Sequence, residues 1–191
     1  MGIHIYNLED LKREWNRGEK FKFLFFWGAE PSADGRITET CLSQWWICPF
    51  TVEGVTYTCA EQYMMAEKTR LFHDTERLEN IMKAKHPKEM KAFGRAVRNF
   101  DETTWENNCR DIVRRGNIAK FSQNPELLEF LMRTENKILV EASPMDRIWG
   151  IGLGKANPNA ECPDKWRGTN FLGFTLMEVR DLLIEQKGRE E

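Results

Sequence analysis

The chain has 191 residues, 41% of them hydrophobic and 12% aromatic, which is enough apolar side chain to bury a substantial core. Acidic and basic residues nearly balance, for a formal net charge of -2, which excludes a broad basic surface of the kind that holds nucleic acid over a long footprint. We therefore expect one compact domain over residues 1–191.

The N-terminus lacks the basic-then-apolar profile of a signal peptide, and no apolar run approaches the length that crosses a bilayer. The cysteines are odd in number and contain no C-x-x-C pair, and the histidines are scattered. They are Cys41, Cys48, Cys59, Cys109 and Cys162, with His4, His73 and His86. We expect a cytoplasmic protein with no disulfide framework, no metal, no cofactor and no membrane partner.

The first part of the chain predicts one short helix and several strands. Asn7 is placed to cap a helix that runs through Trp15. The aromatic run from Phe21 to Trp27 has no helical period and predicts a buried strand. The segment from Phe50 to Tyr57, interrupted by Glu53-Gly54, has the two-residue turn that predicts a tight hairpin.

From Cys59 the pattern becomes helical. Helices are predicted over Ala60 to Leu71, from a cap at Asp74 to Ala84, after Pro87, and from a cap at Asp101 to about Phe121. On the last of these, an apolar stripe predicts an inward face, made by Trp105, Cys109, Ile112, Gly116 and Ala119.

The C-terminal part mixes a helix start, a strand and a long loop. Asn124-Pro125 begins a helix, Ile138 to Glu141 reads as a strand, and Asn170 to Gln186 predicts an amphipathic helix. Residues Ser143 to Gly168 predict an ordered functional loop, since they are rich in glycine, proline and asparagine yet contain two tryptophans. The expected fold is a mostly helical α+β domain, with a small sheet from the N-terminal strands and Ile138 to Glu141.

The most informative stretch is TCAEQYMMAEK, Thr58 to Lys68. Glu61 and Lys68 lie seven positions apart, nearly two helical turns, so they share a helix face, with Met64 and Met65 on its flank. A carboxylate and an amine desolvated among such side chains acquire shifted pKa values suited to an acid, a base or a nucleophile. The same spacing also suits a structural ion pair or an ordinary amphipathic edge.

A second candidate is SPMDRIWGIGLG, where Asp146 precedes a Trp149-Gly150 turn and two further glycines. Glycines permit close backbone approach, so this loop suits amide N–H groups, one carboxylate and a flat indole against a bound sugar or phosphate. A tight loop in which Trp149 simply packs is the alternative.

Aromatic and basic residues supply further candidates. Some aromatics near the N-terminal strand suit stacking on a base, although most such side chains form core: Phe25, Phe26, Trp27, Trp45 and Trp46. Four arginines suit either phosphate binding or a solvated helix face: Arg95, Arg98, Arg114 and Arg115.

Together these motifs resemble the NADAR superfamily, which includes the YbiA-like N-glycosidases of riboflavin biosynthesis intermediates. The resemblance covers most of the chain, from Phe25 to Gly28 and Cys41 to Trp46, through Tyr57 to Lys68, Gly94 to Glu106 and Arg114 to Leu153, to Trp166 to Arg180. The combination of an E-Q-Y-x-x-x-x-K helix, a D-x-x-W-G-I-G loop and an N-x-L-G helix start is more specific than any one part.

The resemblance implies cleavage of a C1′–N bond in a phosphorylated ribosylaminopyrimidine, or removal of ADP-ribose from a guanine base. It implies functional residues at Glu61, Trp105 and Asp146, with Lys68 also at a motif position. Substrate contacts are expected from Phe26, Trp27, Gly28, Trp45, Trp149, Gly150 and Asn170. Glu61 and Asp146 would divide the acid and cation-stabilising roles, and Lys68, if neutral, would attack the opened ribosyl C1′ as a Schiff-base nucleophile.

Two departures from the bacterial pattern concern the substrate. Many bacterial members carry W-G-D-G-G where this chain has Trp149 to Leu153 without the acid, and residues between Ala29 and Thr40 form an insertion. Two further classes therefore stay open beside the ribosylaminopyrimidine enzyme: an ADP-ribosyl-guanine hydrolase and a non-catalytic module that binds NAD or ADP-ribose. We expect a pocket between the helix of Glu61 and the loop of Asp146.

Overall fold

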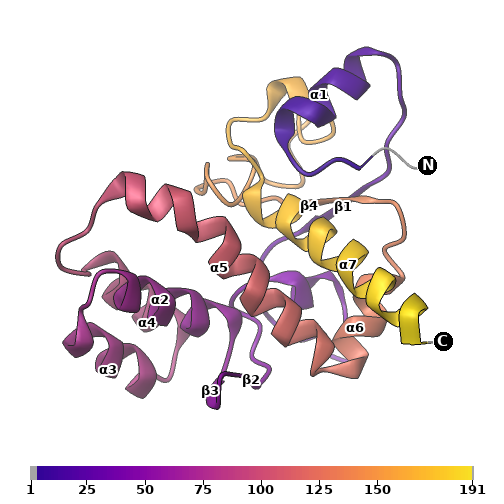
Figure 1. Cartoon of the computed structure of the whole chain (residues 1–191). Helices are drawn as coiled ribbons and strands as arrows, with labels where there is room; N and C mark the ends of the chain where they lie inside the picture. Colours follow the sequence, from indigo (N-terminus) through magenta and orange to yellow (C-terminus); the bar gives the residue numbers. More distant parts are fainter. Residues whose placement is uncertain (1–3, 191) are drawn as a thin grey trace. The chain divides into compact units, whose positions relative to one another are not determined.

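A computed structural model describes residues 4–190 of the chain. By its internal contacts the chain divides into two compact units (Figure 1). Unit 1 is formed by Met1–Ser43 together with Glu126–Glu191, and unit 2 by Gln44–Pro125. The fold class is the expected one, a mixture of helices and short strands in which helices predominate.

Unit 1 is built on a parallel pair of strands. Its elements are α1 (Leu8–Asn16), β1 (Phe23–Phe26), the 3-10 helix η1 (Glu39–Leu42), α6 (Pro125–Met132), β4 (Ile138–Glu141), η2 (Pro163–Lys165) and α7 (Phe171–Glu190). β1 pairs with β4 in parallel, with Phe23 opposite Ile138 and Phe26 opposite Glu141. Parallel strands need a long connection, and here the whole of unit 2 intervenes in the sequence.

The last helix differs from its prediction. α7 packs against β4, and in its first half buried side chains lie on every side, from Leu172 through Met177. Exposed residues begin only near its C-terminal end, from Ile184 to Arg189. A helix that is covered on all faces has no polar stripe, so the expected amphipathic pattern fails in the half that touches the strand pair.

Unit 2 begins with a hairpin of β2 (Phe50–Val52) and β3 (Val55–Tyr57). Its turn residues Glu53 and Gly54 have φ of 50° and 79°, the left-handed values that a two-residue hairpin of this twist requires. Four helices follow: α2 (Ala60–Leu71), α3 (Thr75–Lys83), α4 (Pro87–Arg95) and α5 (Glu102–Ser122). The first of them, α2, packs against each of the other three.

The strands form two separate two-stranded sheets. The sequence predicts one small sheet from the N-terminal strands together with Ile138–Glu141. β1 does pair with β4, whereas β2 and β3 pair only with each other among the described strands. The hairpin turn brings β2 and β3 together locally, so their pairing needs no third strand. No helix in the described part of the chain is long and apolar enough to cross a membrane.

Candidate active site

The helix α2 is the centre of the candidate site. Every residue from Ala60 to Ala66 is buried, as are Lys68 and Thr69. Glu61 is 4% exposed and Lys68 is 9% exposed. The helix is therefore not an ordinary amphipathic edge, and its two ionisable groups are removed from water, where charges are costly unless compensated.

Two aromatic rings flank the amine of Lys68. Its Nζ atom lies 4.3 Å from the ring centroid of Phe100 and 5.0 Å from that of Trp105. Burial, and next the nearby charge of Arg95, lower the pKa of Lys68 below its ordinary value, while the charges of Cys109 and Glu61 offset part of this effect. A lowered pKa increases the neutral, nucleophilic fraction of an amine near neutral pH.

Glu61 lies in the first turn of α2, where the helix dipole favours a negative charge. Its backbone N–H donates to the carbonyl of Gln44 at 2.8 Å. Seven residues at about 1.5 Å each separate its backbone from that of Lys68 by roughly 10 Å along the axis. The carboxylate is nevertheless near enough for its charge to raise the pKa of Lys68.

The residues between Glu61 and Lys68 build the helix into the unit. The side-chain amide of Gln62 donates to the carbonyl of Ile81 at 3.1 Å, and its oxygen accepts from the backbone N–H of Thr58 at 2.8 Å. The ring of Tyr63 lies against Gly116 so closely that a Cβ there would stand 2.5 Å from it. These contacts fix the rotation of α2 and hence the direction of Glu61 and Lys68.

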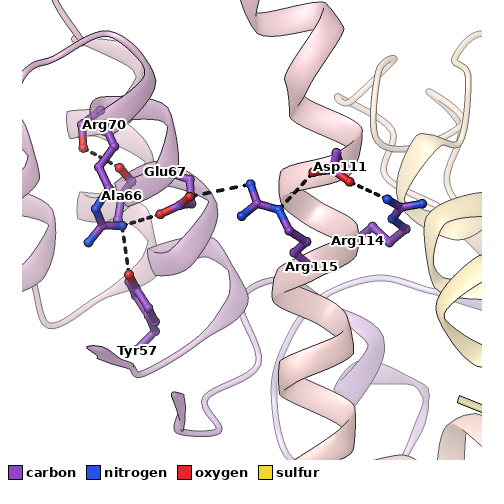
Figure 2. A network of polar contacts seen from close by, with 8 residues as sticks. Tyr57, Ala66, Glu67, Arg70, Asp111, Arg114 and Arg115 are labelled. Carbon is purple, nitrogen blue, oxygen red and sulfur yellow. Dashed lines mark hydrogen bonds and ion pairs between the residues drawn. The ribbon is translucent and has the colours of Figure 1, made fainter. Parts of the chain in front are cut away.

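A polar network joins the outer side of α2 to α5 and β3 (Figure 2). Arg70 donates to the hydroxyl of Tyr57 at 2.9 Å and pairs with Glu67, which also lies 3.8 Å from Arg115. Arg115 in turn pairs with Asp111 at 3.0 Å. These charges brace the two helices against each other.

Three of the four arginines considered for phosphate binding have acidic partners within the unit. Arg114 and Arg115 both pair with Asp111, and Arg98 pairs with Asp74. Arg95 is exposed, and its charge acts on Lys68. It is the arginine of the four whose position bears directly on the amine.

The loop of Asp146 lies in unit 1 and organises itself around that carboxylate. Asp146 Oδ1 accepts from the backbone N–H groups of Ile148 at 2.9 Å and Trp149 at 2.8 Å. The indole of Trp149 packs edge-on against Phe171, with ring centroids 6.2 Å apart. Asp146 is half-buried, so one end of its carboxylate shapes the loop while the group keeps contact with solvent.

Three expected substrate contacts are buried and have structural roles. Asn170 is fully buried, and its side chain accepts from Glu141 N and donates to Leu139 O, both at 2.9 Å, tying α7 to β4. Phe26 is 2% exposed in β1. A Cβ on Gly150 would stand 2.8 Å from the carbonyl oxygen of Glu141. Phe26 and Asn170 are therefore buried side chains, and Gly150 is a position where the backbone is closely packed; their contact with a substrate stays a prediction.

The remaining expected contacts are accessible. Trp27 is 63% exposed, and the following Gly28 has φ of 80°, a left-handed conformation. Trp45, in unit 2, lies half-buried with its ring 6.1 Å from that of His86 and 5.9 Å from Lys91 Nζ. These tryptophans keep the surfaces that stacking on a base requires.

Phe100 is the site residue that the sequence reasoning missed. It directly precedes Asp101, the N-cap of α5, and Trp105 occupies the fourth position of that helix. Apolar residues at these two positions commonly pack together as a hydrophobic staple. The pattern was therefore a usable signal, and in the structure both rings lie beside the same lysine.

Comparison with known proteins identifies the family of this chain. The NADAR domain matches residues 25–184, which includes most of unit 1 and all of unit 2. The chain belongs to the NADAR family. An N-glycosidase of Acanthamoeba polyphaga mimivirus is 44% identical over 169 residues, covering 85% of this chain and 97% of that protein.

Two further comparisons concern YbiA of Escherichia coli. The N-glycosidase YbiA of strain K12 is 31% identical over 139 residues, 73% of this chain and 78% of that protein. The solution structure of E. coli YbiA matches with a TM-score of 0.70 and 27% identity, covering 88% of this chain and 89% of that one. The expected YbiA-like fold is confirmed, and the chain is a member of a family of N-glycosidases, hydrolases that act on N-glycosyl bonds.

Proposed function

We propose that this chain hydrolyses the C1′–N bond of phosphorylated ribosylaminopyrimidine intermediates of riboflavin synthesis. The observation that carries the proposal is the burial of Glu61 and Lys68 on one helix, with the Lys68 amine between Phe100 and Trp105. A buried carboxylate, and a buried amine whose pKa is lowered, are groups that glycosidic cleavage uses.

In this proposal the two carboxylates have different tasks. Cleavage of a C–N glycosidic bond needs a proton on the leaving nitrogen and negative charge near the sugar carbon as it becomes cationic. Glu61, buried in unit 2, and Asp146, half-buried in unit 1, are the two carboxylates that the family resemblance offers for these tasks. Trp105 in unit 2 and Trp149 in unit 1 each carry an indole that suits apolar contact with a substrate.

Lys68 gives the reaction a covalent route. Its neutral amine adds to C1′ of the opened ribosyl group, and the bond from C1′ to the leaving nitrogen breaks as that nitrogen takes a proton. Water then hydrolyses the C1′–lysine imine, which releases the sugar as an aldehyde and restores the amine. The rate of this step rises with pH as Lys68 loses its proton. Because burial lowers the pKa of Lys68, the rate should level off at a pH below the ordinary lysine pKa.

Borohydride tests the covalent route, because it reduces an imine to a stable secondary amine. We expect a mass adduct of the sugar on the peptide that contains Lys68, only when substrate is present. Lys120 is an internal control, since it is also fully buried in unit 2 and also lies near an aromatic ring, 5.1 Å from Phe121. Absence of the adduct together with undiminished turnover in Lys68→Ala would exclude the route.

The second candidate is removal of ADP-ribose from guanine bases. The 63% exposed indole of Trp27 favours it, since a flat apolar surface open to solvent suits stacking of a purine. The loop also lacks the acid of the bacterial pattern, and the residues present there, Ile151 and Leu153, are buried. Substrate preferences of the bacterial enzymes that depend on that acid are therefore not expected in this chain.

One experiment separates the candidates. Purified protein is incubated with ribosylaminopyrimidine phosphate and, separately, with ADP-ribosylated guanine DNA, and released ribose phosphate or ADP-ribose is measured. Turnover of the first substrate alone supports our proposal, and turnover of the second alone replaces it with the ADP-ribosyl hydrolase. Binding of NAD or ADP-ribose without turnover of either substrate would indicate a non-catalytic module.

A further inference from the structure

The loop between α4 and α5 is anchored by one buried carboxylate. Asp74 caps α3, accepting from the backbone N–H of Arg77 at 3.2 Å. The same carboxylate accepts from the backbone N–H of Arg98 at 2.9 Å and from its guanidinium at 2.7 Å. The side chain of Asp74 has no exposed surface, whereas that of Arg98 is 58% exposed. One carboxylate thus binds a helix start and a distant loop together.

These hydrogen bonds persist at neutral pH. The Arg98 guanidinium, helped by the N–H groups of Arg98 and Arg77, holds the pKa of Asp74 well below its usual range. The group therefore stays ionised at neutral pH, where hydrogen bonds to a charged acceptor are at their strongest.

The anchored loop carries the ring that covers Lys68. Phe100 follows Arg98 by two residues, and Asn99 between them has a left-handed φ of 54°. On the other side, Asp101 accepts from Thr104 N at 2.7 Å and begins α5. The ring of Phe100 packs edge-on against Phe72 at 5.3 Å and lies 4.3 Å from the Lys68 amine. Its backbone is thus held on both sides.

We infer that Asp74 is a positioning residue for Lys68: by holding Arg98 it fixes the loop that places Phe100 over the amine. Phe100 is itself 45% exposed, so packing alone restrains it weakly and the anchor is needed to keep it in place. Without the anchor the ring moves away and water reaches the amine. The significance of this arrangement for catalysis rests on the proposed role of Lys68.

The test measures the protonation of Lys68 without any substrate. Trace acetylation with acetic anhydride is followed over a range of pH, and the modified Lys68 peptide is quantified by mass spectrometry. The midpoint of the pH curve gives the pKa of the Lys68 amine, whereas the maximal rate of acetylation also depends on how easily the reagent reaches it. Asp74→Asn keeps a side chain that caps α3 but replaces one accepting oxygen by an amide that donates.

We expect Asp74→Asn to move the midpoint upward, reducing the neutral fraction of Lys68 at pH 8 about threefold or more. Phe100→Ala should give a shift in the same direction, and the double variant should give no larger one, since both changes act through the same ring. Glu76→Gln is the matched control. Glu76 pairs with the guanidinium of Arg98 at 3.2 Å, whereas the backbone N–H of Arg98 donates to Asp74. The midpoint for Lys68 in this variant should equal that of the wild type.

A folded Asp74→Asn with an unshifted midpoint would overturn the inference. If Asp74→Asn does not fold, Arg98→Ala decides, since it removes the guanidinium contact and keeps the backbone N–H; a smaller upward shift supports the inference and no shift overturns it. The pH profile of turnover is measured in parallel. A shifted midpoint with an unchanged turnover profile would leave the positioning role intact and remove Lys68 from the proposed mechanism.

Discussion

The helix α2 and the loop of Asp146 hold their ionisable groups in opposite ways. Glu61 and Lys68 are buried on a helix that packs against three other helices, and burial lowers the pKa of Lys68. Asp146 is half-buried, and the N–H groups of its own loop hold it. In unit 2 the packing of other elements around α2 therefore shifts the pKa of Lys68. In unit 1 the backbone N–H groups of the loop itself orient the carboxylate of Asp146.

The largest effect is expected at Glu61. Glu61→Gln keeps the shape of the side chain and removes its charge and its proton, so turnover should fall about 10²- to 10⁴-fold while ligand binding survives. Glu67→Gln is the control on the same helix, since Glu67 pairs outward with Arg70 and Arg115. Steady-state kinetics and calorimetric binding measure both. Wild-type turnover in Glu61→Gln would contradict a catalytic role.

Asp146 distinguishes charge from geometry. Asp146→Asn retains an oxygen that accepts from Ile148 and Trp149 but loses the charge, so turnover should fall about 10²-fold with an ordered loop. Asp146→Ala should also speed hydrogen exchange at those two amides. Wild-type turnover in Asp146→Asn would contradict a catalytic role for this carboxylate.

Packing around α2 gives a stability comparison between the units. Gly116→Ala places a methyl group 2.5 Å from the ring of Tyr63 and should reduce the free energy of unfolding by about 1–3 kcal/mol. Gly154→Ala, in unit 1, meets open space and should change it by less than about 0.5 kcal/mol. Urea unfolding measures both. Equal stability of the two variants would show that α2 and α5 can separate without cost.

The smallest effect is expected at Tyr63. Its hydroxyl is buried without a hydrogen-bond partner among the described residues, so Tyr63→Phe should be neutral or stabilising by up to about 1 kcal/mol. Burial raises the pKa of Tyr63 from 10.0 to about 12, so the folded state keeps this proton longer than the unfolded state. The resulting stability is present below pH 10 and is lost as pH rises toward 12. Between pH 10 and pH 12 the free energy of unfolding, measured by urea unfolding, should fall less steeply with pH in Tyr63→Phe than in the wild type. An identical pH dependence would contradict this.

Local chemistry explains which parts of the fold the sequence predicts. Asn7, Asp74 and Asp101 cap helices where expected, because a cap needs only a side-chain oxygen and the next few N–H groups. The Glu53-Gly54 turn likewise specifies its hairpin. For the site, the sequence places Glu61 and Lys68 on one helix face by spacing alone.

Only the tertiary structure decides the environment of those residues. The division of the strands into two sheets, the burial of α7 on all sides in its first half, and the structural use of Asn170 each depend on segments far apart in the sequence. The same holds for Phe100, which reaches Lys68 through a loop that Asp74 anchors. Residue spacing determines which side chains share a helix face, whereas desolvation depends on what packs against that face, and that is decided only when the chain has folded.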